Sequence, residues 1–331
     1  MRLLDSVARS GAPQPLQVTG APCFASRIMD CPLRYVLGDD LTRASAELAF
    51  ADGERLAGCL DLLRLPAPRL WIEWNDEAHK RVIHESRFIE KFDAAAVGRK
   101  VGVLLRASSD GLKAVGRTFW TDAGGDECGQ VTLSPLETHI DLRGEFAQVL
   151  QHEDALRGGF VDVTDAESPA MASLLDHVRF RFDDSWAEYY RSAAADPAFR
   201  RSLIRDSLAA IAWDVPFLLA FMLLLSAKDA TRKVAVSRDG INRKRSAQGR
   251  APLLDHVEVH ACLDAVSIAE PRDDASERQS PRLHHVRGHL VRRDQRVFWR
   301  VPHLRGSAAR GVVRSRTVCL SLTGKGGEAR V

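Results

Sequence analysis

The stretch 70-LWIEWNDE-77 determines how the first half of the chain is interpreted, because its residues alternate as they do along a β-strand. Side chains of a strand point to opposite faces in turn, so Trp71 and Glu73 share one face while Ile72 and Trp74 share the other. We therefore predict a strand here. Glu73 is expected to be an ordinary surface carboxylate, and the alternative role is that of a catalytic acid.

The segments around this strand, from Cys59 to Leu142, are also apolar runs separated by turn-forming residues. Glycine, proline, serine and aspartate recur in the separators LPAP, SSDG and DAGGDECG, a composition typical of short connections between strands. We predict an antiparallel β meander that forms a mostly β N-terminal body over residues 1–150.

The pattern changes in residues 151–230, where apolar side chains recur every three or four positions, as on amphipathic helices. The most apolar run, FLLAFMLLLSA from Phe217 to Ala227, has eleven residues, whereas a membrane-spanning helix needs roughly 20. We predict a helical middle region with one buried core helix, restarted near Pro216, and no membrane contact.

The last part of the chain is predicted to contain a basic connector with a strand, residues 231–270, and a basic β-hairpin tail, residues 271–331. In the tail, a turn at residues 294–295 would pair Val286 with His303 across the two strands. With the preceding regions, these elements predict an α+β fold.

Length and composition set the broad class of the protein. At 331 residues and 45% hydrophobic content, the chain can bury a substantial core and is expected to form two packed units. Its six cysteines are scattered and no pair has the C-x2-C spacing of a zinc site, so we expect reduced thiols. The opening MRLLDSVARSGAPQPLQV lacks the apolar core of a signal peptide, and a cytoplasmic location is expected.

Positive charge is concentrated toward the C-terminal end, although the formal net charge of the chain is only +3. Residues 241–331 contain 18 Lys and Arg against 9 Asp and Glu, a balance of +9, whereas residues 1–240 carry −6. A basic region on an acidic body favours an anionic partner. Nucleic acid is the expected partner, an acidic protein is the alternative, and a solvated surface that binds nothing in particular is a third interpretation.

The predicted hairpin presents this charge on one face, because Leu290 and Trp299 would pack on the other. Guanidinium groups pair with phosphates, and aromatic rings stack on unpaired bases. The segment from Arg282 to Arg316 contains arginine but no lysine. This choice favours bidentate recognition of anions, which the guanidinium group provides. The candidate nucleic-acid-binding residues are Arg243, Lys244, Arg245, His285, Arg287, His289, Arg293, Phe298, Arg300 and Arg305.

Histidines in the same part of the chain offer a metal-binding alternative. His256, Glu258 and His260 alternate along one predicted strand and would share a face, and His285 and His289 would share a face of the hairpin. Imidazole and carboxylate groups are zinc ligands when they converge. We expect no cofactor, and zinc at these residues is the alternative.

Motifs of the common enzyme classes are absent from the sequence. The chain has no phosphate-binding G-x-x-x-x-G-K-[ST] loop, no G-x-G-x-x-G turn, no G-x-S-x-G nucleophile elbow and no H-E-x-x-H zinc helix. A metal-dependent hydrolase or nuclease would have to use the C-terminal histidines, or Glu73 with Glu90 and Lys91. We therefore expect that the protein is not an enzyme.

The segment from Leu223 to Gly306 resembles a group of bacterial proteins of phages, prophages and plasmids. In that group a hydrophobic helix leads to L-N-K-x-R-x-x-x-G-x-x-P-L and a strand, and the chain closes on H-x-x-R-G-H-x-R-R and V-W-V-R-P-H strands. Ile241 replaces the usual leucine. The matching positions are Asn242, Arg245, Gly249, Pro252, Leu253, His285, Arg287, Gly288, His289, Arg293, Trp299, His303 and Gly306. The resemblance implies a mobile-element origin and the cytoplasm of a bacterial host, and it implies no activity.

Charge and resemblance together predict a non-enzymatic phage or prophage accessory protein that contacts nucleic acid through a basic C-terminal β-hairpin. One alternative is a protein-interaction or assembly component that binds an acidic host or phage protein. The other is a metal-dependent hydrolase or nuclease that uses the C-terminal histidines.

Overall fold

The structure, a computed structural model, forms two compact units. Unit 1 comprises Met1–Cys262 with Leu290–Trp299, and unit 2 comprises Leu263–His289 with Arg300–Val331. The residues that the structure describes are 2–10, 24–51, 53–86, 91–92, 94–121, 131–144, 146, 174, 176–184, 186, 196, 198–199, 202, 207–208, 211–262, 267–268, 282–286, 289–293, 296–300, 303–305 and 307–312.

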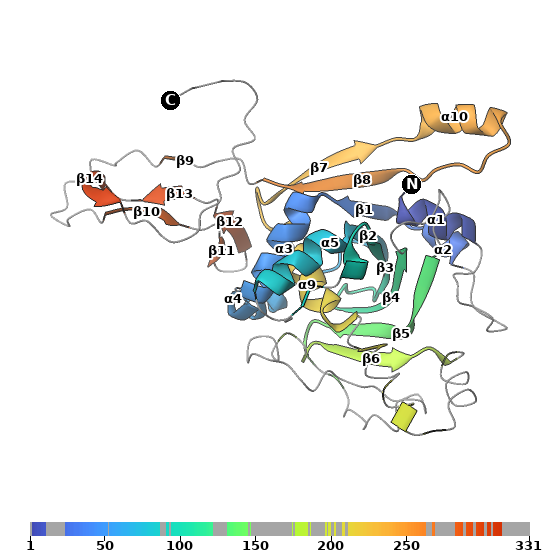
Figure 1. The fold of residues 1–331 in the computed structure, drawn as a ribbon, viewed down its shortest axis with the longest axis horizontal. Helices are drawn as coiled ribbons and strands as arrows, with labels where there is room; N and C mark the ends of the chain where they lie inside the picture. Colours follow the sequence, from blue (N-terminus) through green and yellow to red (C-terminus); the bar gives the residue numbers. More distant parts are fainter. Residues whose placement is uncertain are drawn as a thin grey trace. The chain divides into compact units, whose positions relative to one another are not determined.

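A mixed eight-stranded sheet, in the order β6-β5-β4-β3-β2-β1-β8-β7, forms the centre of unit 1 (Figure 1). Its strands are β1 (Leu33–Leu37), β2 (Arg69–Asn75), β3 (Lys100–Ala107), β4 (Lys113–Thr121), β5 (Val131–Asp141), β6 (Val178–Phe182), β7 (Thr231–Val236) and β8 (His256–Ala261). Strands β2 to β6 pair antiparallel in chain order, but β1 is parallel to both β2 and β8. The sheet as a whole is therefore mixed, because β1 adds parallel pairs from outside the segment Cys59–Leu142 that was expected to form an antiparallel meander.

Helices cover both faces of this sheet. The helical segments of unit 1 are α1 (Leu3–Ser10), α2 (Ala25–Met29), α3 (Asp39–Ala51), α4 (Gly53–Ala57), η1 (Leu60–Leu62), α5 (Asp76–Glu85), η2 (Ala94–Ala96), α9 (Asp214–Ser226) and α10 (Asp239–Ala247). Helices α3, α4, α5 and α9 share the larger apolar core with one face, and α1 and α2 share a smaller core with the other. Helix α3 is the crossover that the parallel β1–β2 pair requires.

Alternation along β2 divides its side chains between the two cores, as the sequence predicts. Trp71 packs in the smaller core beneath α1, whereas Ile72 and Trp74 pack in the larger core with α9. Both tryptophans are essentially fully buried. The strand therefore joins the two hydrophobic layers.

Helix α9 confirms the predicted buried core helix, since every residue from Asp214 to Leu224 is buried. The helix begins at Asp214, so Pro216 lies in its first turn, where proline breaks no intrahelical hydrogen bond. Among the described residues, no helix is long and apolar enough to cross a membrane.

Two regions differ from the sequence-based expectation. Strand β6 lies within the region expected to be helical, because Val178, Phe180 and Phe182 alternate with Arg179 and Arg181 and give a period of two. Residues 1–150 contain helices between their strands, so this region is mixed rather than mostly β.

The predicted hairpin tail is divided between the two units. Strands β11 (His289–Arg293) and β12 (Arg296–Arg300) flank residues 294–295 as predicted, and Leu290 and Val297 are buried in the larger core of unit 1. Trp299 packs against the same core. The apolar side chains of this hairpin therefore hold it on unit 1.

Unit 2 contains a four-stranded sheet in the order β14-β10-β13-β9. Its strands are β9 (Ser267–Ile268), β10 (Arg282–Val286), β13 (His303–Arg305) and β14 (Ser307–Val312). Strand β10 pairs antiparallel with β13, and Val286 lies opposite His303, which confirms the predicted register at this position.

Candidate functional site

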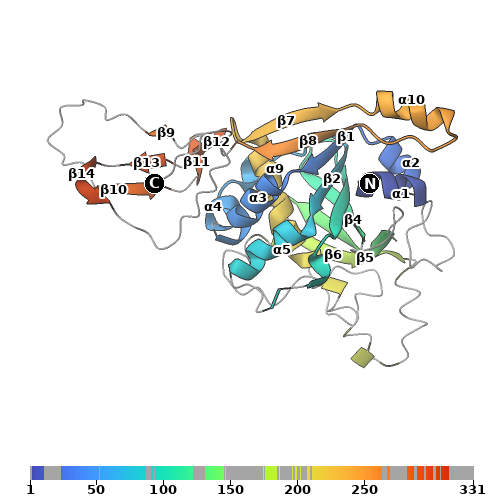
Figure 2. The ribbon, with the colours of Figure 1, turned by 45° about the horizontal axis from the view of Figure 1, so that its top comes forward.

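The basic arm is the part of unit 1 formed by β7, α10 and β8. Strand β7 is the edge strand of the large sheet and pairs antiparallel with β8. Figures 1 and 2 show α10 beyond the ends of these two strands, away from α3, α4, α5 and α9. No residue of α10 is buried. The arm thus presents one helix to solvent on a two-stranded support.

Backbone and side-chain hydrogen bonds give the tip of the arm a defined shape. The Asn242 side chain accepts from the backbone N–H of Leu253 at 2.8 Å and donates to the Leu253 carbonyl at 2.9 Å. Gly249 ends α10 with φ +64°, and the bonds from Gly249 to Ser246 and from Arg250 to Arg245 form a Schellman cap. Asn242, Gly249 and Leu253 thus shape this turn.

Most cations of the arm are exposed. Residues 231–255 contain seven Lys and Arg against two Asp, a balance of +5. Arg243 and Lys244 are exposed, and within the described chain neither has an ion-pair partner. Arg245 is half-buried because its Nε donates to the Ala251 carbonyl at 2.8 Å. Of the three predicted residues in α10, Arg243 and Lys244 are therefore the two available to an anion.

The other predicted nucleic-acid-binding residues lie outside the arm. Phe298 is half-buried and forms a β-bridge with Lys228, just before β7 begins, so it lies at the opposite end of β7 from α10. His285 and His289 lie in β10 and β11, and Arg287 is outside the described residues. The exposed members of the set are Arg293, Arg300 and Arg305.

The predicted metal ligands of β8 share one face but do not converge. Glu258 Oε1 lies 3.8 Å from His256 Nε2, and Glu258 Oε2 lies 3.9 Å from His260 Nε2, so the two rings approach different oxygens. Arg2 forms an ion pair with Glu258 Oε1, and His260 Nδ1 lies 3.5 Å from Asp40 Oδ1. This arrangement is a network of polar contacts among the buried His256 and the half-buried Glu258 and His260, and these described side chains do not converge on one point.

Glu73 is buried, not on the surface as expected from the sequence. Its side-chain oxygens accept the backbone N–H groups of Leu3 and Leu4, both at 2.9 Å, and Trp71 Nε1 lies 3.4 Å away. These N–H groups open α1, where a helix leaves its donors unsatisfied and favours a negative charge. Glu73 therefore anchors α1. Glu90, its expected partner in a nuclease site, is outside the described residues, and Lys91 is exposed.

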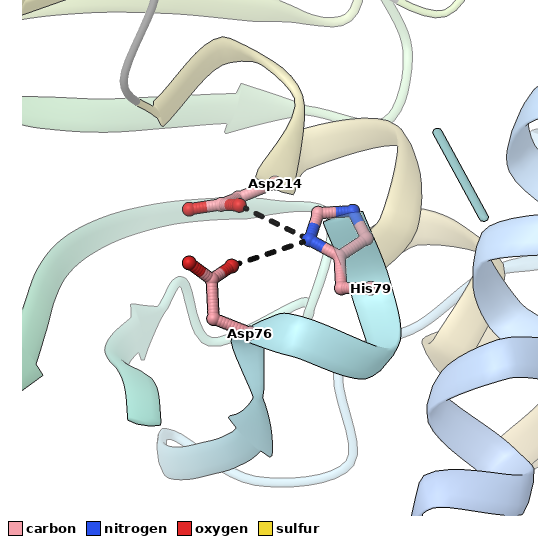
Figure 3. A group of neighbouring side chains, drawn as sticks. All are labelled: Asp76, His79 and Asp214. Carbon is pink, nitrogen blue, oxygen red and sulfur yellow. Dashed lines mark ion pairs between the residues drawn. The ribbon is translucent and has the colours of Figure 1, made fainter. Parts of the chain in front are cut away.

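A second polar group, which sequence reasoning missed, lies between the sheet and α9. We call Asp76, His79 and Asp214 the buried centre (Figure 3). Asp76 is the first residue of α5, capped by Asn75, and His79 follows one turn later on the same side of that helix. Asp214 is the first residue of α9. Two helix N-termini therefore direct carboxylates at one histidine.

The geometry of the buried centre is compact. His79 Nδ1 lies 3.9 Å from Asp76 Oδ1 and 3.6 Å from Asp214 Oδ1. The His79 side chain is completely buried, with ring centroids of Phe217 at 4.6 Å and Phe50 at 6.0 Å. In the described part of the chain, no other group of three His, Cys, Asp or Glu residues places its ligand atoms this close together.

Burial shifts the protonation of these groups. Desolvation raises the pKa of Asp214 to about 7 and lowers the pKa of His79 to about 4. Burial also acts to raise the pKa of Asp76, but contact with His79 and the positive charges of Lys80 and Arg99 outweigh it and lower that pKa. The centre thus combines a neutral imidazole, an ionised carboxylate and a carboxyl group that titrates near neutrality.

The sequence contained one signal for this centre, the D-x-x-H spacing of Asp76 and His79 on one helix face. Its third member, Asp214, is distant in the chain and is brought close only by packing of α9 against β2 and α5. Comparison with protein-family models, with curated proteins and with solved structures finds no match to this chain.

Proposed function

We propose that the protein is a non-enzymatic phage or prophage accessory protein that contacts nucleic acid through the basic arm. The observation that carries this proposal is α10, which has no buried residue and exposes Arg243 and Lys244 without an ion-pair partner in the described chain. The mobile-element origin rests on the resemblance of residues 223–306.

The shape of the arm supports contact with a groove. An α-helix with its side chains is about 10–12 Å wide, and the major groove of B-form DNA is about 12 Å wide. Figure 2 shows α10 at the end of β7 and β8. Arg243 and Lys244 of this helix are exposed. A nucleic acid could approach α10 without displacing any part of the apolar cores.

The charge of the arm supports the same proposal. A balance of +5 over residues 231–255 attracts a polyanion, and neutralised phosphates release counterions. Arg232, Lys233 and Arg250 are exposed along with Arg243 and Lys244 and extend the positive surface. Binding should therefore weaken steeply as salt rises.

The test is fluorescence anisotropy of the full-length protein with labelled single- and double-stranded DNA and RNA over a range of salt concentrations. The variant Arg243→Ala/Lys244→Ala should bind more weakly, and the slope of log affinity against log salt should fall by about 0.9 for each lost contact with duplex phosphate. A matched control, Arg43→Ala/Lys91→Ala, removes the same charge from exposed positions elsewhere in unit 1.

If both variants bind nucleic acid equally weakly, the net charge of the protein, and not the arm in particular, determines the affinity. An unchanged affinity of the arm variant would remove α10 from the proposal, and Arg300→Ala/Arg305→Ala would then test the C-terminal arginines. If the wild type binds none of the four nucleic acids, the proposal fails and an acidic protein partner becomes the better explanation of the same charge.

A further inference from the structure

We propose that Asp76, His79 and Asp214 bind one first-row divalent metal ion, such as Zn²⁺ or Mn²⁺, which links α5 to α9 (Figure 3). The buried centre contains no residue of the basic arm, so this proposal stands independently of the contact with nucleic acid. The ion would act as a structural link, because all three ligands are buried.

The separations within the centre suit ligands that share an ion. The distances of 3.6 and 3.9 Å from His79 Nδ1 to the two carboxylates exceed the roughly 2.7–3.2 Å of a hydrogen bond. Zinc binds nitrogen and carboxylate oxygen at about 2.0–2.2 Å, so two ligands of one ion lie up to about 4.2 Å apart. All three ligand atoms lie within 4.8 Å of one another, so a bound ion would draw the most distant of them slightly together.

Burial leaves these atoms without their usual partners. Within the described residues, Asp76 Oδ1, Asp214 Oδ1 and both ring nitrogens of His79 have no hydrogen-bond partner. Buried polar atoms in native proteins are nearly always paired with protein, water or an ion. One ion bound between the two carboxylates and Nδ1 would satisfy three of these four atoms at once.

The donor set indicates the class of metal. Mg²⁺ and Ca²⁺ are bound mainly by oxygen, and Cu⁺ prefers sulfur ligands. One imidazole nitrogen with two carboxylate oxygens suits Zn²⁺, Mn²⁺ or Fe²⁺. Two ionised aspartates would also neutralise the charge of a divalent ion.

Lys80 and Arg99 are the cations with which this ion competes. Lys80 Nζ lies 4.0 Å from Asp214 Oδ1, and Arg99 Nη1 lies 3.7 Å from Asp76 Oδ2. Arg99 approaches the oxygen of Asp76 that faces away from His79, which leaves Oδ1 for the ion. The rival explanation places a proton on Asp214, in which case Asp214→Asn replaces one neutral group by another and should not destabilise the protein.

The test is the metal content of the untagged full-length protein, dialysed against Zn²⁺ or Mn²⁺ and then against metal-free buffer, measured by plasma mass spectrometry. We expect about one ion per chain, because binding to a preorganised site is coupled to folding. EDTA should lower the thermal midpoint and added ZnCl₂ or MnCl₂ should restore it, while Co²⁺ should give visible ligand-field absorption.

Asp76→Asn and Asp214→Asn keep the shape of each side chain and should weaken metal binding on the order of 10-fold or more. The control His260→Gln removes a half-buried imidazole of β8, outside the buried centre, and should keep the ion. A wild-type protein with less than about a tenth of an ion per chain, and with no thermal shift on adding Zn²⁺ or Mn²⁺, overturns the proposal. Unchanged metal content in a folded Asp214→Asn protein also overturns it. If the aspartate variants do not fold, the content and chelation of the wild type decide.

Discussion

The buried centre and the basic arm place charged residues in opposite surroundings. Asp76, His79 and Asp214 lie among aromatic side chains, where each charge is separated from water. Arg243 and Lys244 lie on a helix with no buried residue. The centre must therefore find its partners inside the protein, whereas the arm can keep its charges solvated until a partner arrives.

This difference explains why the two regions support different kinds of proposal. An unpaired charge on the surface costs little free energy, because water solvates it. Exposure therefore shows only that a charged residue is able to contact a partner. An unpaired polar atom in the interior is destabilising, so its presence indicates that something is still to be bound there. The arm indicates the charge of a partner, and the centre indicates the number and type of ligand atoms.

The largest expected change in stability comes from a substitution beside the buried centre, and it tests whether the packing there is rigid. Phe217 is completely buried, with its ring 4.6 Å from His79 and 4.9 Å from Trp74 between centroids. Phe217→Ala should lower the free energy of unfolding by about 3–5 kcal/mol, because it removes apolar contact and leaves a cavity. Urea unfolding followed by circular dichroism measures the change.

The control for this variant is Val234→Ala in the arm. Val234 is 42% exposed in β7, so its truncation should change stability by no more than about 0.5 kcal/mol. Similar values for the two variants would show that the centre collapses around the missing ring, and the contrast between the regions would not hold.

A smaller effect concerns Glu137, whose surroundings are intermediate between the two regions. It contacts His139, Arg117 and Arg181, and these contacts lower its pKa to about 2 against the opposing effect of burial. The unfolded chain therefore takes up a proton at this residue first as the pH falls. Its contribution to stability is present above about pH 4.5 and is lost between pH 4.5 and 2.

Glu137→Gln should flatten the pH dependence of stability in this acid range, with a difference of about 2 kcal/mol after allowance for solvent screening. Urea unfolding at a series of pH values measures it. The matched control is Glu77→Gln: contact with Arg81 also lowers the pKa of Glu77, but this pair is open to solvent and screened, so the change in the profile should be much smaller. Parallel profiles for the wild type and Glu137→Gln would contradict this account.

Local patterns in the sequence predicted the elements that depend on neighbouring residues. The alternation of residues 70–75, the apolar run of α9 and the pairing of Val286 with His303 all follow from short-range periodicity and turn position. The parallel pairing of β1 with β2 and β8 could not be predicted in this way. It joins separate segments of the chain through hydrophobic contacts that leave no local pattern in the sequence. Strand β6 was missed because its five residues lie in a segment whose wider spacing resembles a helix.

The candidate sites divide in the same way. Arg243 and Lys244 could be proposed from charge alone, since exposure follows from the polarity of their surroundings. Glu73 was wrongly expected at the surface, because nothing near it in the sequence shows that α1 would place two N–H groups on its oxygens. The sequence could not predict that Asp214 lies beside Asp76 and His79, because this proximity depends on the packing of α9 against α5 and β2.

The smallest expected effect is confined to the arm and concerns the cap of α10. Gly249 has φ +64°, which strains any residue with a Cβ, so Gly249→Ala should destabilise the turn by about 1 kcal/mol. Gly240, in the first turn of the same helix, has nothing within 4 Å of an added Cβ, and Gly240→Ala should instead stabilise α10 by up to about 1 kcal/mol. Hydrogen exchange of the α10 amides should be faster in the first variant and slower in the second, with the amides of α9 unchanged in both.

Equal exchange in the two variants would mean that the Asn242–Leu253 pairing alone holds the tip. A helix that loosens without any loss of affinity for nucleic acid would show that the arm contributes charge to binding, and that the fixed orientation of α10 contributes nothing.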